Sequence, residues 1–256
     1  MNRRLALAAT ACLAALSLHG AALAMISPDP SPQARAKAQS EARPPRADQP
    51  PTPEAIAAAR DRADGLIAEA HAQAYFTNIT DGAAPKVRHT ASGLECVFGL
   101  NDIASIRVYD SKGPLRGEDV SCGFTTGLAD GAKVSVTVTA THFPANLDDV
   151  MGALSGDIRK AMPDAGPAAG RFSSINLADK AGAESMPSHR VARFNATEAG
   201  QPIFTRAAAG IVHGWTVSQR TTAPADHATT ADLLSEVLLS VAMADVFKAT
   251  PEPGKP

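Results

Sequence analysis

The segment from Lys133 to Phe143 constrains the fold of this chain more strongly than any other part of the sequence. Valine or alanine stands at every second position from Val134 to Ala140, and serine or threonine fills the positions between them. A period of two places one set of side chains on a buried face of a β-strand and the other set on a wetter face. Such strands are typical of antiparallel sheets, so we expect an antiparallel sheet at the centre of the fold.

Helical spacing predicts helices that pack on this sheet. After a suitable N-cap at Asn146, apolar residues recur at a period of 3.6 over Leu147–Ala161. A wider apolar pattern from about Thr230 to Phe247 predicts a helix in the core. Thr52 and Pro53 suit the start of an additional, N-terminal helix. One line of the last helix holds Leu234, Leu238, Val241 and Asp245.

Shorter apolar alternations predict further strands. We expect them at residues 94–98, 106–108, 120–124, 171–177, 190–196, 202–208 and 211–221. Glu198–Gly200 has the composition of a hairpin turn. Residues 134–140 and 211–217 are expected to be central strands, with Trp215 buried under the last helix. The predicted fold class is therefore α+β, an antiparallel β-sheet with helices packed on it, preceded by an N-terminal helix.

The order of these elements resembles the Mog1/PsbP-like α+β fold over residues 131–248. The segments that carry the resemblance are Val134–Val138, Leu147–Ile158, Gly214–Val217 and Leu233–Val241. The resemblance implies a curved antiparallel sheet with helices on its faces. It also implies a binding or assembly-accessory module, with no catalytic residues to carry over. The N-terminal helix and the strands that bear the cysteines lie outside it.

The first 24 residues have the three-part layout of a secretory signal peptide. Two arginines precede an apolar run over Leu5–Leu18, and Ala22–Ala24 supplies small residues for cleavage. The run is too short to span a bilayer comfortably. We therefore expect cleavage after Ala24 and a periplasmic or secreted protein that is not inserted in a membrane. An uncleaved signal that serves as an anchor is an alternative. A lipoprotein cleaved at Cys12 is disfavoured by the poor motif before it.

Composition divides the rest of the chain into a linker, one domain and a C-terminal tail. Residues 25–53 contain eight prolines. Such a segment buries too little apolar surface to offset the entropy of ordering it. We expect a proline-rich, disordered linker at 25–53, a single α+β domain at 54–249 and a disordered tail at 250–256.

Cys96 and Cys122 are the two cysteines left after removal of the signal. Each shares its apolar parity with its strand neighbours. In an oxidising compartment an even pair predicts a disulfide. The chain-entropy model assigns such a bond a stabilisation of about 3–4 kcal/mol. Two buried free thiols are the alternative. The scattered histidines have no zinc-ligand spacing, so no metal site is expected.

Charge and motifs argue against several common activities. Without the signal the chain has 22 basic and 26 acidic residues and no basic block, so we expect neither nucleic acid nor an anionic membrane surface as a partner. A nucleophile-elbow motif and a glycine-rich phosphate loop are both missing from the sequence. We therefore assign no catalytic residue and expect no cofactor.

One group of residues is a candidate binding face. His213 stands two positions before Trp215 and shares its face if both lie on one strand, with Arg206 and Arg220 nearby. The structural alternative is a rim of amphipathic side chains that covers the core. The leading hypothesis is a non-enzymatic, secreted or periplasmic binding or accessory domain of the bacterial cell envelope, whose partner is an envelope protein or a small ligand. The alternative is an envelope hydrolase with an unmarked active site around His213, Arg206 and Arg220.

Overall fold

The computed structural model describes residues 50–109, 117–143, 145–170, 172 and 187–250. These residues belong to one compact unit that begins at Pro50. The predicted signal peptide, nearly all of the predicted linker, all but one residue of the strand expected near 171–177 and the predicted tail beyond Thr250 lie outside the described residues, so they stay predictions. At the two ends of the expected domain, Pro53 and Thr250 already belong to the folded part, as the first residue of a helix and the cap of another.

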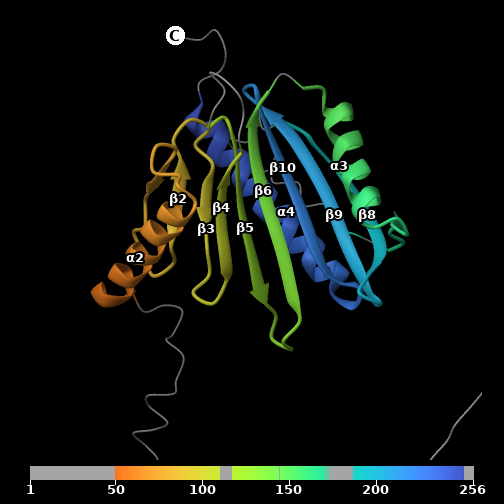
Figure 1. Ribbon diagram of the computed structural model, residues 1–256, viewed down its shortest axis with the longest axis horizontal. Coiled ribbons are helices and arrows are strands. Elements are labelled where there is room, and N and C mark those ends of the chain that lie inside the picture. The colour runs from red at the N-terminus through yellow and green to blue at the C-terminus, as the bar shows by residue number, and fades with distance from the viewer. Residues whose placement is uncertain (1–49, 110–116, 144, 171, 173–186, 251–256) are drawn as a thin grey trace, which may run out of the picture. The chain divides into compact units, whose positions relative to one another are not determined.

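A seven-stranded antiparallel sheet forms the centre of the described structure (Figure 1). In spatial order its strands are β4 (Ile103–Val108), β5 (Asp119–Gly127), β6 (Lys133–His142), β10 (Trp215–Pro224), β9 (Gln201–Val212), β8 (His189–Glu198) and β7 (Gly166–Pro167). The alternating segment is β6, and its Val134, Val136 and Ala140 are buried as the period of two predicts. The α+β fold class is confirmed.

Helices cover the two faces of this sheet at different places. Helix α4 (Ala228–Ala249) follows the short 3-10 turn η3 (Ala225–His227) and lies behind the sheet in the view of Figure 1. Helix α3 (Leu147–Ala161) packs on β8 and β9, where its Ile158 joins Ile203 and Ala207. The intervening residues of β9, such as Phe204, belong to the cluster that includes α4. Strand β9 is therefore buried on both faces.

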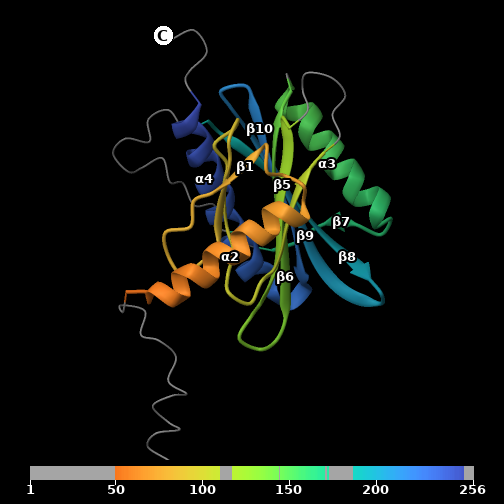
Figure 2. The same ribbon diagram turned by 60° about the vertical axis from the view of Figure 1, so that its left-hand side comes forward.

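A second, three-stranded sheet was not anticipated. Its strands are β1 (Phe76–Asn78), β2 (Lys86–His89) and β3 (Glu95–Val97), and they pair in that order. Helix α2 (Pro53–Glu69) lies beside it, as Figure 2 shows, and the hydroxyl of Thr52 accepts a hydrogen bond from the Ala55 amide at 3.2 Å. The sequence predicts the strand at 94–98 but not its place in a separate sheet.

The strand expected at 211–221 is wrong as a single element. A two-residue turn at His213 and Gly214 divides it, because both residues adopt positive φ, 47° and 86°. Ile211 and Val212 end β9, and β10 begins only at Trp215. The predicted turn before β9 is confirmed, with Ala199 and Gly200 at φ 49° and 78°. Turns of this kind match the right-handed twist of the strands that they join.

Among the described helices, none is long and apolar enough to cross a membrane.

Candidate functional site

The four residues predicted to form a binding face are dispersed in the structure. Trp215 is buried, with its ring stacked on His142 at a centroid distance of 4.8 Å and His89 at its edge at 5.8 Å. His213 lies in the turn and not on the strand, and its Nδ1 is 2.7 Å from the carbonyl oxygen of Thr250. Trp215 is thus a core residue, and His213 attaches the turn to the end of α4.

The two arginines of that group lie on opposite faces of the sheet. Arg206 is fully buried against α4. Arg220 pairs across the ladder with Ala207, the next residue of β9, so its side chain points to the other face. The structure therefore does not bring His213, Arg206 and Arg220 together into one site.

Arg206 instead belongs to a buried ionic cluster between the sheet and α4. Its guanidinium donates hydrogen bonds to Glu236 and, at 2.9 Å, to Oε1 of Gln219, and its Nε lies 3.3 Å from Asp232. Arg193 donates to the same Asp232 through Nε at 2.6 Å. Both carboxylates are almost wholly buried, yet each faces a cation, so the cluster neutralises itself.

Glu236 shows how this pairing acts on a buried acid. Burial alone raises the pKa of Glu236, but the hydrogen bond and charge of His189 and the charges of Arg206 and Arg193 outweigh it, so the net pKa is lowered. The Nε2 of His189 lies 2.6 Å from Oε1 of Glu236. Glu236 is therefore held as a charged, fully partnered carboxylate.

An apolar cavity lies nearer the C-terminal end of the same helix. It has a volume of about 260 Å³ and is bounded by β3, β5, β6 and α4. Its apolar wall is formed by the Cys96–Cys122 disulfide and by Phe98, Phe124, Val138, Leu238, Val241 and Ala242. A mostly apolar cavity with a few polar groups at one side is the usual form of a small-molecule site, and the volume of this one is slightly below the usual range of roughly 300–1,000 Å³.

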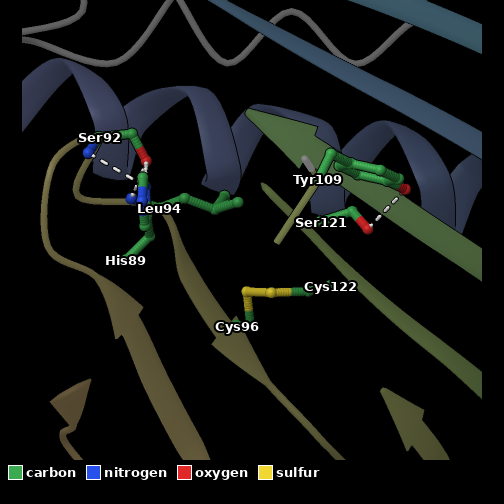
Figure 3. Close-up of a disulfide and its surroundings, with 7 residues drawn as sticks. All are labelled: His89, Ser92, Leu94, Cys96, Tyr109, Ser121 and Cys122. Carbon is green, nitrogen blue, oxygen red and sulfur yellow. Dashed lines mark hydrogen bonds between the residues drawn. A yellow bond between two sulfur atoms is a disulfide. The ribbon is translucent and has the colours of Figure 1, made fainter. Parts of the chain in front are cut away.

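The disulfide joins the two sheets at the wall of this cavity. Cys96 of β3 and Cys122 of β5 are bonded, as the sequence predicts, with their Cα atoms 6.2 Å apart (Figure 3). Both residues are buried. Because the bond ties the three-stranded sheet to the large sheet, it fixes the position of β3 opposite α4.

A buried histidine anchors the loop that leads into β3. Nε2 of His89 lies 2.8 Å from the carbonyl oxygen of Gly117, so it donates, and Nδ1 is free to accept from the Ser92 hydroxyl at 2.8 Å (Figure 3). Burial lowers the pKa of His89, although the bond to Gly117 opposes this. A neutral His89 is thus part of the rigid support of the cavity wall.

Charged side chains line the side of the cavity that adjoins a second, more open hollow, and this side is called the opening below. Both oxygens of Glu95 are occupied, Oε2 by Lys86 Nζ at 2.5 Å and Oε1 by Arg88 Nε at 2.9 Å. Asp245 of α4 also lines the opening, and within the described residues it has no hydrogen-bond or ion-pair partner for its side chain. The second hollow has a volume of about 250 Å³ and shares Glu95 and Asp245 with the cavity.

Asp245 is the acid with a raised pKa at this opening. Burial is the larger cause and the nearby charge of Glu95 adds to it, whereas the positive charges of Lys248, Lys86 and Arg88 oppose it. The net result raises the pKa of Asp245 to about 6. Perturbed acids in a cleft are frequent in functional sites.

The outer surface of α4 beside the cavity is also apolar. Leu233, Val237 and Val241 recur at helical spacing and are 45%, 40% and 49% exposed. Val241 belongs both to this stripe and to the cavity wall. The exposed apolar stripe is therefore continuous with the apolar wall of the cavity.

The sequence did not single out this site. Its residues come from β3 and from α4, about 150 residues apart in the chain, so no local motif contains them. One signal was present: Asp245 continues the apolar line of Leu234, Leu238 and Val241 on the predicted helix. A carboxylate on an apolar helix face is costly unless it is paired or has a use.

Comparison with known proteins identifies no family for this chain. No protein-family model matches it, and no curated protein sequence does. Among solved structures, one similar chain is LpqN of Mycobacterium tuberculosis, described as involved in cell envelope biogenesis. The two are 10% identical, the match covers 56% of this chain and 84% of that chain, and the TM-score is 0.33. Similarity at this level carries no argument about function. The resemblance to the Mog1/PsbP-like fold stays a prediction.

Proposed function

We propose that this chain is an exported, non-enzymatic domain of the bacterial cell envelope that binds a small, largely apolar ligand. The ligand occupies the cavity bounded by β3, β5, β6 and α4. The observation that carries the proposal is the cavity of about 260 Å³, with its apolar wall, its charged opening and the exposed apolar stripe beside it.

Two features support export. The N-terminal 24 residues have the layout of a signal peptide. The Cys96–Cys122 disulfide forms part of the cavity wall, and disulfides persist in oxidising compartments such as the periplasm and the extracellular space. Ligand binding and export are linked in this proposal, because the bond that the compartment permits also holds the wall in place.

The alternative of an envelope hydrolase has less support. A hydrolase needs converging polar groups at a reactive centre. Its candidate residues His213, Arg206 and Arg220 lie in a turn and on two opposite faces of the sheet. The cavity wall itself is mostly apolar and is suited to holding a ligand rather than to transferring protons.

The direct test is binding of a neutral probe, 1-octanol, to the full-length mature protein by isothermal titration calorimetry or by NMR shift perturbation. We expect saturable binding, with shifts centred on Phe124, Val138 and Ala242. Replacing Ala242 by leucine fills the cavity and should lower affinity at least tenfold, while Ala153→Leu on the exposed surface of α3 should not change it.

The fold of the Ala242→Leu variant is checked by its thermal unfolding, since overpacking alone costs about 1–3 kcal/mol when no space is available. Leu238→Phe is a second cavity-filling variant from the same wall. Absence of octanol binding by the wild-type protein, or unchanged affinity in folded samples of both variants, contradicts the proposed site.

A further inference from the structure

We propose that the ligand of this cavity is a cationic amphiphile, whose apolar body enters the cavity and whose amine pairs with the carboxylate of Asp245 at the opening. This inference rests on the proposed function, since it specifies the chemistry of the ligand for the same cavity. It follows from how the charges at the opening are balanced.

The ionisable side chains that line the apolar cavity are Lys86, Glu95 and Asp245. Lys86 and Glu95 form an ion pair at 2.5 Å, and Arg88 donates to the second oxygen of Glu95. Glu95 therefore has no oxygen left without a cation. Asp245 is the acid whose charge is not matched by a direct contact within the described residues.

The surroundings of Asp245 make this unmatched charge costly. Val241 and Ala242, one turn earlier on α4, and Leu238, two turns earlier, belong to the apolar wall of the same cavity. Asp245 is partly buried, and burial is the main cause of its pKa of about 6. A cation that arrives with the ligand would supply the missing partner and favour the charged form of the acid.

The cations already present do not fill this role. Lys86 and Arg88 are committed to Glu95. Lys248, three residues after Asp245 on α4, is exposed, borders only the adjoining hollow and makes no ion pair among the described residues. These three charges lower the pKa of Asp245 only in part, because burial and Glu95 outweigh them. An ammonium group at the cavity opening would lie closer to the carboxylate than any of them.

The experiment compares three probes that share one apolar body: octylammonium, 1-octanol and octanoate, each below its micelle concentration, by calorimetry at pH 7.5. We expect octylammonium to bind about tenfold more tightly than octanol, the factor expected of one partly buried ion pair. Octanoate should bind more weakly than octanol, because its carboxylate meets Asp245 and Glu95.

Asp245→Asn removes the charge and keeps the shape of the side chain. We expect this variant to bind octylammonium and octanol equally. Asp61→Asn, at an exposed position on α2, is the matched control and should keep the preference of the wild-type protein. The wild-type preference should also shrink between pH 7.5 and pH 5, as Asp245 becomes protonated, and it should be independent of pH in the asparagine variant.

The outcomes separate the two claims. If octanol binds but octylammonium shows no advantage, or if the advantage persists in Asp245→Asn, the cationic head group is overturned and the cavity proposal stands. Tighter binding of octanoate would point to an anionic head group beside Lys248 and would also overturn the cationic one. Failure of all three probes contradicts the proposed function itself.

Discussion

Two acids of helix α4, Glu236 and Asp245, lie in opposite electrostatic environments. Glu236, toward the N-terminal half, faces Arg206 and His189 of the sheet, and its pKa is lowered. Asp245, near the C-terminal end, faces an apolar cavity and Glu95, and its pKa is raised to about 6. Burial of an acid therefore does not by itself determine in which direction its pKa is shifted. What decides its role is whether a cation contacts the carboxylate directly.

The region around Glu236, where each acid has a cationic partner, has a structural role, whereas the region around Asp245 is the candidate binding site. Around Glu236 and Asp232, two arginines and a histidine come from β8 and β9, and no space for a ligand is needed to balance the charges. Around Asp245 the wall is apolar and an opening adjoins it. Changes in the first region should therefore alter stability, and changes in the second should alter binding.

The largest effect is expected from Arg206→Met. This change leaves Glu236 and Asp232 buried with less positive charge opposite them. Removing one partner of a buried ion pair typically costs about 3–5 kcal/mol. Urea unfolding at pH 7 measures the loss. Arg220 lies on β10 and points to the opposite face of the sheet from Arg206. Arg220→Met is therefore the matched control and should cost less than about 1 kcal/mol. Equal losses in the two variants would show that the cluster has no special role.

A smaller loss is expected when the disulfide is removed. Cys96→Ala combined with Cys122→Ala should lower the free energy of unfolding by about 3 kcal/mol, through the greater freedom of the unfolded chain. It should also weaken octanol binding, because β3 is no longer tied to β5. Unfolding and calorimetry on the same sample measure both. A variant that keeps its full affinity would show that the wall is held by packing alone.

The smallest effect, and of opposite sign, is expected from Asp245→Asn in the absence of ligand. The pKa of Asp245 in the folded chain, about 6, exceeds its ordinary value of 3.8, so the wild-type fold loses stability as pH rises from about 4 to about 6. The asparagine variant should be more stable than the wild type by about 1 kcal/mol at pH 7.5, after allowance for solvent screening.

That advantage should vanish below about pH 4, where the acid is protonated in both the folded and the unfolded chain. Thermal unfolding at pH 7.5 and pH 3.5 measures it, provided that the wild-type protein stays folded at the lower pH. A variant that is less stable than the wild type at pH 7.5 would mean that Asp245 has a stabilising partner, as Glu236 does, and the contrast between the two acids would be wrong.

The sequence predicted the parts of this fold that depend on local periodicity. The strand at β6 and the bounds of α3, Leu147–Ala161, follow from patterns of two and 3.6 that need no tertiary information. The disulfide followed from the parity of two cysteines. The His213–Gly214 turn was missed because apolar residues continue on both sides of it, so no polar cluster marks the break.

Other features depend on contacts that a local pattern does not contain. Strands β1 and β2 have three and four residues, too few to show a period, and the strand predicted at 94–98 gave no sign of the separate sheet that it joins. The candidate site was missed because β3 and α4 meet only in the folded chain, through the disulfide and the large sheet. Arg206 was assigned to a surface, whereas Glu236 and Asp232, thirty and twenty-six residues away, make its complete burial possible.

The most direct test of the contrast between the two acids is a ¹³C NMR titration of the side-chain carboxyl groups of Asp245 and Glu236, without and with saturating octylammonium. We predict that Asp245 titrates near pH 6 in the free protein and at clearly lower pH in the complex, and that the pKa of Glu236 stays below its ordinary value of 4.5 in both. A pKa of Asp245 at or below its ordinary value of 3.8 in the free protein, or one that does not change when the amine binds, would contradict the contrast between the two acids.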